Sequence, residues 1–331
     1  MPLALVTGGA GFIGSHVAET LLARGHEVVV LDDLSGGFED NVPPGARLIT
    51  GSINDVPLIE NLFSQNQVDY VYHLAAYAAE GLSHFIKRFN YQNNLIGSVN
   101  LINAAVNHGT RCFVFTSSIA VYGASPSLPM TEETPAHPED PYGIAKLAVE
   151  QELEASRRMF GLDYVVFRPH NVYGERQNIG DRYRNVVGIF MNQILQGRPM
   201  TVFGDGTQTR AFSYIGDVAP VIASAATTPA AYNQAFNIGA DRAYSVNELA
   251  RAVATSMGVE ANIVHLEPRN EVQHAYSSHD KVRSVFGERT LHGLDEGLQC
   301  MAQWVRSHGA RTSRRFDGIE ITRNLPSVWL E

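Results

Sequence analysis

The sequence predicts an α/β protein built on a doubly wound parallel sheet, and two observations carry this prediction. Short apolar runs alternate with helical stretches through the first half of the chain. Continuous apolar strands separated by helices are typical of a parallel sheet covered on both faces. The first apolar run also leads through Thr7-Gly8-Gly9-Ala10-Gly11-Phe12-Ile13-Gly14 into a helix. A glycine-spaced turn at this place is typical of a Rossmann-type, phosphate-binding fold.

The strands are expected where runs of aliphatic and aromatic residues are too short for helices. These runs lie at residues 3–6, 27–31, 47–50, 70–72, 112–115 and 164–167. Helices are expected over residues 12–24 and 83–108, from about 142, and over 186–196, 246–257 and 294–307. The rhythm changes after Arg168, which predicts a cofactor-binding domain at residues 1–170. Residues 171–331 are then a smaller C-terminal α/β substrate lobe, with some segments returning to the main sheet.

Composition limits the classes of function. With 331 residues the chain can bury a large core. A net charge of −9 argues against a nucleic-acid or anionic membrane surface, since both reward clustered Lys and Arg. No run reaches the roughly 18 to 20 apolar residues of a membrane span, and no signal peptide is evident. Two cysteines make a disulfide framework improbable, and the histidines show no metal-ligand spacing. We therefore expect a cytoplasmic protein with no metal and with no nucleic-acid or membrane partner.

The glycine turn has the context of a dinucleotide site. An apolar strand precedes it, a helix follows it, and Asp32 stands about 20 residues on, at the end of the second strand. A carboxylate there accepts hydrogen bonds from the adenosine ribose and would repel a 2′-phosphate. No Arg follows Asp32 to receive that phosphate, so NAD is expected rather than NADP. The alternative is a tight turn that binds no ligand.

Tyr142 and Lys146 lie four positions apart, hence on one face of a helix. An unperturbed Tyr pKa of about 10 is too high for a base at neutral pH. A neighbouring ammonium and a nicotinamide cation would both favour the phenolate. Ser118 follows an expected strand, at the sheet edge where a nicotinamide must lie, and can share a hydrogen bond with a reacting alcohol. These residues predict the oxidation of an alcohol; by itself the Tyr-Lys spacing also fits a solvated helix face.

Several segments carry a resemblance to a known family. They are the glycine turn, His73-Leu74-Ala75-Ala76, Asn93-Asn94, Thr116-Ser117-Ser118 with Val121-Tyr122-Gly123, Tyr142 with Lys146, and Arg168-Pro169-His170-Asn171-Val172-Tyr173-Gly174. Over its full length the chain resembles the extended short-chain dehydrogenase/reductases, and within them the nucleotide-sugar 4-epimerases. Gly51-Ser52-Ile53 and Arg210-Ala211-Phe212 depart from that family's usual Gly-Asp-Ile and Arg-Asp-Phe.

The resemblance implies a set of site residues. The catalytic positions fall on Ser118, Tyr142 and Lys146. The cofactor positions, besides Tyr142 and Lys146, fall on Gly8, Gly11, Phe12, Ile13, Gly14, Asp32, Ser35, Gly36, Ser52, Ile53, Leu74, Ala75, Ala76, Asn94 and Thr116. Substrate positions fall on Ser118, Asn171, Phe203, Arg210 and Arg269. The family also implies a homodimer joined through the helix at 83–108 and the helix that begins near Tyr142.

The reaction follows from what stands after Ser118. Related dehydratases and decarboxylases carry a carboxylate there, whereas this chain has Ile119 and Ala120, which transfer no proton. Reversible oxidation at C4 of a UDP-hexose, and therefore 4-epimerisation through a 4-keto sugar, is the reaction that remains. A non-catalytic NAD-sensing module is a remote alternative.

The identity of the sugar depends on a loop with three cations, Arg176, Arg182 and Arg184. Arg182 or Arg184 turned inward could pair with a C6 carboxylate; equally, all three could be solvated. The chain most resembles bacterial UDP-glucuronate 4-epimerases, including those of moenomycin biosynthesis, which implies UDP-glucuronate as the substrate and UDP-galacturonate as the product. UDP-glucose and UDP-N-acetylglucosamine are the alternatives. The tail at 311–331 is expected to pack on its own body rather than to bind a partner.

Overall fold

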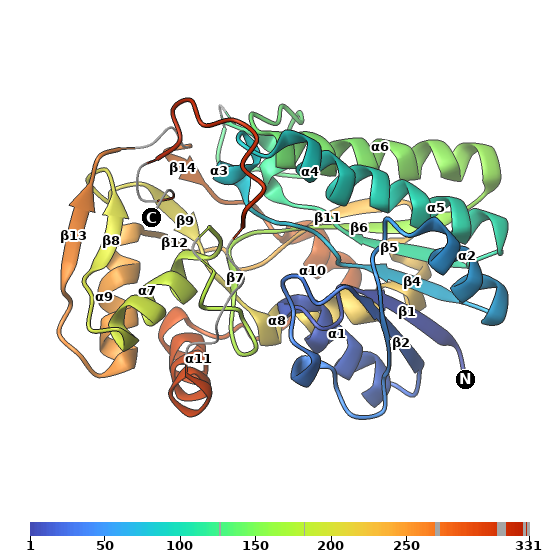
Figure 1. Ribbon diagram of the computed structural model, residues 1–331, viewed down its shortest axis with the longest axis horizontal. Coiled ribbons are helices and arrows are strands. Elements are labelled where there is room, and N and C mark those ends of the chain that lie inside the picture. The colour runs from blue at the N-terminus through green and yellow to red at the C-terminus, as the bar shows by residue number, and fades with distance from the viewer. Residues whose placement is uncertain (126, 182, 269–271, 310–315, 327–328, 330–331) are drawn as a thin grey trace.

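The structure is a computed structural model that describes residues 1–331 except 126, 182, 269–271, 310–315, 327–328 and 330–331. A seven-stranded sheet with the order β11-β6-β5-β4-β1-β2-β3 forms its centre (Figure 1). Its strands are β1 Leu3–Thr7, β2 Glu27–Asp32, β3 Arg47–Thr50, β4 Tyr70–His73, β5 Cys112–Thr116, β6 Asp163–Pro169 and β11 Gln234–Ile238. Every pairing within it is parallel. The predicted α/β fold class is confirmed.

Helices cover both faces of this sheet. On one face α1 (Phe12–Ala23), α8 (Ile215–Ser224) and α10 (Asp280–Phe286) share a core with the strands. On the other, α2 (Val56–Gln65), α5 (Gly97–Asn107) and α6 (Pro141–Phe160) do so. Because both faces are covered, β1 and β5 are buried at all five positions, which explains their unbroken apolar runs.

The helix expected over 83–108 is divided in the structure. A short α3 (Glu80–Ser83) ends before Ile86, whose φ of −138° is not helical, and α4 (Lys87–Tyr91) then begins. Residues Gln92–Ile96 form a π-helical turn that leads into α5. Turns of this kind often mark functional sites, and this one carries Asn93 and Asn94. The expectation of one continuous helix was wrong: the chain leaves helical geometry at Ile86, next to Phe85, whose carbonyl accepts hydrogen bonds from the N–H groups of Glu320 and Ile321.

A second group of elements forms the lobe beside the sheet (Figure 1). It contains β7 Val172–Tyr173, α7 Val186–Leu195, β8 Met200–Phe203, β9 Thr209–Ala211, β10 Ser213–Tyr214, β12 Ala243–Ser245, α9 Val246–Met257, β13 Ile263–Leu266, β14 His274–Ala275 and α11 Leu294–His308. Helices α7, α9 and α11 share one apolar core, to which Phe190, Leu249 and Met301 belong. β11 follows part of this lobe in sequence, yet pairs with β6 in the main sheet. The chain therefore passes from the lobe back to the main sheet at β11 and then returns to the lobe.

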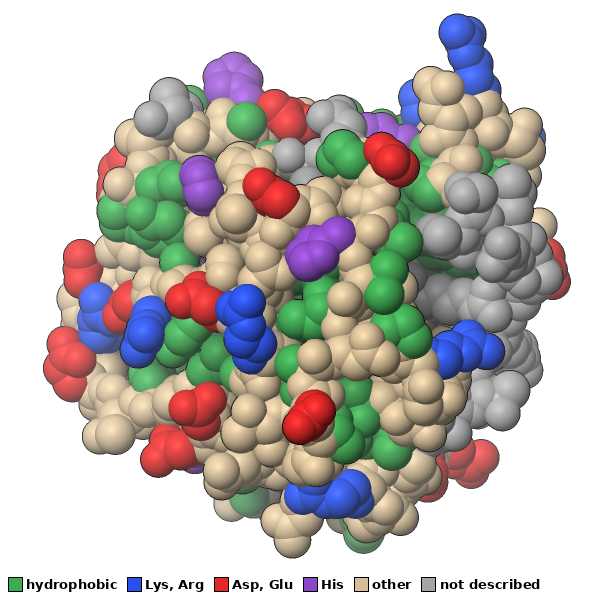
Figure 2. Space-filling model, turned by 90° about the vertical axis from the view of Figure 1, so that its left-hand side faces the viewer, with side chains coloured by type: hydrophobic (Ala, Val, Ile, Leu, Met, Phe, Trp, Pro, Cys, Tyr) green, Lys and Arg blue, Asp and Glu red, His purple; other side chains and the backbone are tan. Residues whose placement is uncertain are grey.

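The surface of the lobe is mixed in charge. On the face shown in Figure 2, Lys and Arg side chains lie among Asp and Glu rather than gathering into a basic patch. Within the described part of the chain, no helix combines the length and the hydropathy that a bilayer crossing requires. The described residues likewise contain no cluster of three His, Cys, Asp or Glu side chains placed to hold a metal ion.

Candidate active site

One large cavity, of about 570 Å³, lies at the carboxyl edge of the main sheet, between the sheet and the lobe. Residues from the ends of β1, β2, β5 and β6 line it on one side, and residues of β8 and β9 line it on the other. In a doubly wound fold, ligands bind beyond the carboxyl ends of the strands. This cavity is therefore the candidate active site.

The glycine turn makes a close backbone cradle at one end of the cavity. Gly8 has a φ of +72°, and a Cβ there would lie 2.7 Å from the backbone nitrogen of Ala75. A Cβ on Gly14 would lie 2.1 Å from the carbonyl oxygen of Gly8, and one on Gly37 would lie 2.6 Å from Ala10. Gly8, Gly14 and Gly37 therefore have no room for a side chain. The first residues of α1, Phe12 and Ile13, line the cavity. The cradle fits the diphosphate of a dinucleotide.

Asp32 is held rigidly at the end of β2. Its carboxylate accepts hydrogen bonds from the backbone N–H of Ala10 at 3.0 Å and of Leu34 at 2.9 Å. Burial raises the pKa of Asp32, and these two hydrogen bonds oppose the rise. An oriented carboxylate beside the glycine cradle fits the ribose hydroxyls of an adenosine.

Helix α6 places Tyr142 and Lys146 on the cavity wall. Asp140 caps the helix by accepting a hydrogen bond from Gly143 N–H, and Pro141 fills its first position. Tyr142 therefore lies in the first turn and is only 6% exposed. Burial raises the pKa of the Tyr142 phenol, and the carboxylates of Glu80 and Asp140 add to the rise.

Two groups oppose that rise: a hydrogen bond with Ser118, and the charge of Arg184. Lys146 Nζ lies 5.7 Å from the centre of the Tyr142 ring, and in the protein alone burial is the largest influence on the pKa of Tyr142. The side chain of Lys146 is itself buried, which lowers the pKa of its ammonium to about 7, with Glu150 opposing. The Lys146 Nζ donates a hydrogen bond to the Thr116 carbonyl at 2.7 Å. The protein thus supplies the phenol, and the positively charged nicotinamide ring of bound NAD would supply the charge that favours the phenolate.

A buried ion pair lies directly behind Lys146. Glu150 accepts hydrogen bonds from Arg168 at 3.0 and 2.5 Å and from the Ser117 hydroxyl at 2.5 Å. Arg168 also donates to the Tyr122 hydroxyl at 2.7 Å, which in turn donates to Asn237 at 2.8 Å. This network joins α6, β5, β6 and β11, and so fixes the Lys146 side of the cavity.

The opposite wall comes from the lobe. Asn171 adopts a φ of +40° and donates its side-chain amide to the Ala211 carbonyl at 3.1 Å. The Arg210 guanidinium is held by the carbonyls of Thr209, Val272 and Gln273. A guanidinium fixed in this way on a cavity wall fits a diphosphate, and Phe203 lines the same wall.

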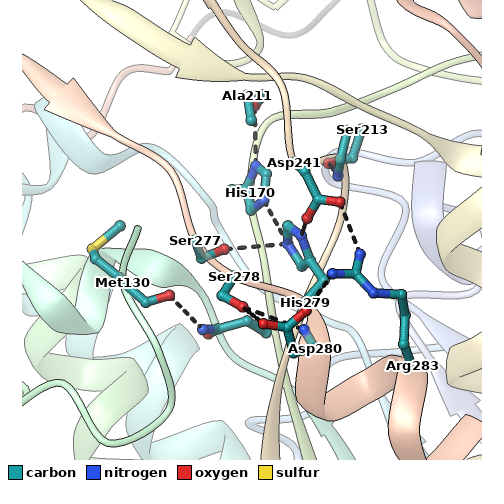
Figure 3. A network of polar contacts seen from close by, with 12 residues as sticks. Met130, His170, Ala211, Ser213, Asp241, Ser277, Ser278, His279, Asp280 and Arg283 are labelled. Atoms are coloured by element: carbon teal, nitrogen blue, oxygen red, sulfur yellow. Dashed lines mark hydrogen bonds and ion pairs between the residues drawn. The ribbon is translucent and has the colours of Figure 1, made fainter. Parts of the chain in front are cut away.

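His170 lines the cavity next to Asn171 and also bonds the Ala211 carbonyl, at 3.0 Å (Figure 3). Behind it lie His279, Asp241 and Arg283. Because one carbonyl accepts from both Asn171 and His170, this cluster contributes to the position of Asn171.

The three arginines of the loop are placed differently. Arg176 faces away, pairing with Glu19 on α1 at 2.9 Å. Arg184 lines the cavity, with its guanidinium 4.8 Å from the Tyr77 ring centre, and pairs with Asp181 at 2.5 Å. Arg182 lies outside the described residues, as does Arg269.

Most of the residues predicted from the sequence do line this cavity. They are Gly8, Gly11, Phe12, Ile13, Gly14, Asp32, Ser35, Gly36, Ile53, Leu74, Ala75, Ala76, Thr116, Ser118, Tyr142, Lys146, Asn171, Arg184, Phe203 and Arg210. Ser52 and Asn94 are not among the lining residues. Ser52 accepts a hydrogen bond from Asn54 N–H, and Asn94 exchanges two hydrogen bonds with the backbone of Tyr77. Asn94 thus fixes the 75–77 segment from behind, while Asn93 reaches the wall.

Among the lining residues that were not predicted are three that bear on Tyr142 or on the sugar end of the cavity: Glu80, Asp140 and Trp329. The capping pattern Asp140-Pro141 was a usable signal for a residue next to Tyr142. Glu80 lies in the short helix α3 and Trp329 near the end of the chain, and no local pattern marks either as a residue of this cavity.

Comparisons with known proteins agree with this site. The NAD dependent epimerase/dehydratase family matches residues 4–239. A putative UDP-glucose 4-epimerase of Methanocaldococcus jannaschii is 34% identical over 306 residues, 92% of this chain and 98% of that protein. The UDP-glucose 4-epimerase of Thermotoga maritima, solved with UDP-glucose, has a TM-score of 0.88 at 35% identity, over 92% of this chain and 99% of its own. A UDP-glucuronic acid 4-epimerase of Bacillus cereus, solved with UDP-glucuronic acid and NAD, has a TM-score of 0.84 at 26% identity, over 92% and 99%.

Proposed function

The chain belongs to the NAD dependent epimerase/dehydratase family, and we propose that it is a UDP-hexose 4-epimerase. Its cofactor is NAD, which the glycine cradle and the oriented Asp32 fit. The observation that carries the proposal is the wall beside Ser118, where Ile119 and Ala120 line the cavity. Neither side chain transfers a proton, which disfavours elimination and leaves reversible oxidation at C4.

The proposed roles follow from position. Tyr142 takes the proton of the 4-hydroxyl and later returns it, while Ser118 shares a hydrogen bond with the same oxygen. NAD, held by the glycine cradle and Asp32, would supply a reversible hydride acceptor for C4 and a positive charge that favours the Tyr142 phenolate. Lys146 contributes to that field and holds a ribose. Arg210 and Asn171 grip the UDP, so that the 4-keto sugar can turn over while it stays attached.

The preferred sugar is proposed to be UDP-glucuronate, which the epimerase converts to UDP-galacturonate. Arg184 supports this choice, because its guanidinium lines the cavity and acts on the charge of Tyr142. A C6 carboxylate needs such a cation, since a bare buried carboxylate is costly. UDP-glucose is the second candidate: Asp181 already pairs with Arg184, and Glu80 and Asp140 make the surroundings of Tyr142 acidic. UDP-N-acetylglucosamine is the third sugar to test. A role in moenomycin assembly is proposed only on the condition that UDP-glucuronate is the substrate.

The deciding experiment incubates the purified protein with UDP-glucuronate, UDP-glucose and UDP-N-acetylglucosamine, without added cofactor. We expect C4 epimers of unchanged mass by NMR and mass spectrometry, formed fastest from UDP-glucuronate. A product smaller by one water would contradict epimerisation. Net consumption of stoichiometric NAD, or no turnover of any sugar by protein that binds NAD, would also overturn the proposal.

Arg184→Ala tests the sugar preference within the same panel. Loss of a charged hydrogen bond costs about 1.5 to 3 kcal/mol, or roughly 10- to 100-fold in kcat/KM for the uronate, with little loss for UDP-glucose. Arg176→Ala is the matched control, because Arg176 pairs with Glu19 outside the cavity. Equal losses for both sugars would remove Arg184 as the group that recognises the carboxylate.

A homodimer is part of the proposal. Exposed apolar side chains lie along the helices expected to join it: Ile96 before α5, and Ile144, Met159 and Phe160 on α6. Pairing these helices with their copies would bury that surface. A monomer by light scattering at micromolar concentration would exclude the dimer without touching the reaction.

A further inference from the structure

The described part of the C-terminal tail lies against α3 and α4 (Figure 1, dark red). Glu320 fastens it: its carboxylate accepts hydrogen bonds from Arg88 N–H at 2.9 Å and Phe89 N–H at 3.0 Å, at the open start of α4. The backbone N–H groups of Glu320 and Ile321 both donate to the Phe85 carbonyl. Phe316 adds ring contacts with Phe89 at 4.8 Å and with Tyr77. These hydrogen bonds and ring contacts pack the described tail residues against the rest of the protein.

The tail brings Trp329 to the cavity. Trp329 is 8% exposed and lines the same cavity as Tyr142. Its indole meets the Tyr183 ring edge-on at 5.6 Å and the Phe85 ring at 6.1 Å. A Cβ on Gly81 would lie only 3.3 Å from the Trp329 ring, so no larger side chain fits at residue 81 without displacing the indole.

The neighbours of Trp329 place it near the reacting end of the cavity. Gly81 adjoins Glu80, and Tyr183 adjoins Arg184; both charges act on the pKa of the Tyr142 phenol, Glu80 raising it and Arg184 lowering it. Trp329 thus bridges the two segments that flank Tyr142, one from α3 and one from the 176–185 loop.

We propose that Trp329 is a positioning residue that closes the sugar compartment and keeps the 4-keto sugar in the cavity between the two hydride transfers; this rests on the proposed function. A broad indole face offers a sugar apolar contact without fixing its orientation. Such a wall suits an intermediate that must turn over inside the site but must not leave it. If the ketone leaves after the first transfer, C4 stays oxidised in the released sugar and the enzyme is left holding the reduced cofactor.

Fluorescence tests the placement independently of turnover, because the chain has only two tryptophans. The variant Trp304→Phe leaves Trp329 as the reporter, and Trp329→Phe leaves Trp304, which stacks on His308 in α11. Titration of the NAD-loaded variants with UDP-glucose and UDP-glucuronate should give a saturable change in Trp329 emission and none in that of Trp304. A sugar that binds, by calorimetry, yet leaves Trp329 emission unchanged would overturn the proposal.

Kinetics test the role. Trp329→Ala should lower kcat/KM about tenfold, the scale of an aromatic contact, whereas Trp329→Phe should keep most of it. Trp329→Ala should also release a ketone, trapped with borodeuteride as a sugar carrying deuterium at C4. Arg323→Ala, at an exposed site in the same tail, is the control. Unchanged turnover without released ketone would overturn the proposal. If the parent protein epimerises no UDP-sugar, the proposed function fails, while the fluorescence result still decides where Trp329 stands.

Discussion

The Glu150–Arg168 pair behind Lys146 and the His279–Asp241 pair behind His170 both support a wall of the cavity, but they differ in exposure. The side chains of Arg168 and Glu150 are 10% and 9% exposed. In the second pair, His279 is 2% exposed while Asp241 is 53% exposed, and Arg283 also reaches Asp241 (Figure 3). One ion pair is enclosed at both ends, and the other opens to solvent at its acid.

The hydrogen bonds of the histidine pair determine its protons. The Ala211 carbonyl only accepts, so His170 donates from Nδ1 and its Nε2 accepts from His279. His279 also bonds the Asp241 carboxylate through Nδ1 at 2.6 Å. His279 therefore lies between His170 and Asp241, and its Nε2 also contacts the Ser277 hydroxyl at 3.2 Å. Its hydrogen bond with Asp241 holds the pKa of that acid down to about 2.

This difference has a consequence for stability. An enclosed pair has lost its water on both sides, so removing one partner strands a buried charge. In the second pair the acid is half exposed, so water screens its interaction with His279 and the pair contributes less to stability. The same kind of contact should thus have unequal effects on the two walls.

The largest effect is expected at the enclosed pair. Glu150→Ala should lower the free energy of unfolding by about 3 to 5 kcal/mol, because it leaves Arg168 buried and unpaired. Asp241→Asn, at the open pair, should cost about 1 kcal/mol or less. Urea unfolding monitored by circular dichroism measures both. The double change Glu150→Leu with Arg168→Met should recover most of the loss. Equal costs at the two sites would show that exposure is not what separates them.

Next in size is the effect at Tyr142, which stands in front of the enclosed pair. Tyr142→Phe should lower turnover at least ~10²-fold, the scale of losing a general acid–base group, while UDP-sugar affinity changes little. Turnover is measured on the preferred UDP-sugar and affinity by calorimetry. Activity within a few-fold of the parent would exclude Tyr142 as the base. The enclosed wall would then serve folding rather than chemistry.

The sheet and the cofactor turn could be predicted because their causes are local. β1 and β5 are apolar at every position since both faces are covered, and the turn needs glycine where a Cβ would meet backbone. β11, with the sequence Gln-Ala-Phe-Asn-Ile, shows no such run, because Asn237 is used inside the Tyr122 network.

The rest of the site depends on contacts between distant segments. Glu80 and Trp329 line the same cavity although about 250 residues of sequence separate them, and no spacing rule links them. The three arginines of the loop look alike in sequence, yet Arg176 turns to α1 and Arg184 turns to the cavity. The pKa of Tyr142 follows from burial, which the Tyr-Lys spacing could not reveal.

The smallest effect is a pH dependence that distinguishes the histidines from the acids. Burial, with the charge of His279, lowers the pKa of His170 to about 3, and burial lowers that of His73 to about 3 as well. Between these values and the unfolded pKa of about 6.5, the unfolded chain binds protons that the folded chain does not. The stabilisation is therefore present above about pH 6.5 and is lost as the pH falls toward 3. Asp241 acts with the same sign, but only between its ordinary pKa and about 2.

His170→Gln should thus flatten the fall of unfolding free energy between pH 6.5 and 4.5 by up to about 1.4 kcal/mol per pH unit, the contribution of one proton. Urea unfolding in a series of buffers measures the slope. His265→Gln, at an exposed histidine of β13, is the control and should leave the slope close to that of the parent. A His170→Gln slope equal to the parent's would mean that this ring takes no proton on unfolding. The loss of stability toward pH 3 would then come from His73 and the acids instead.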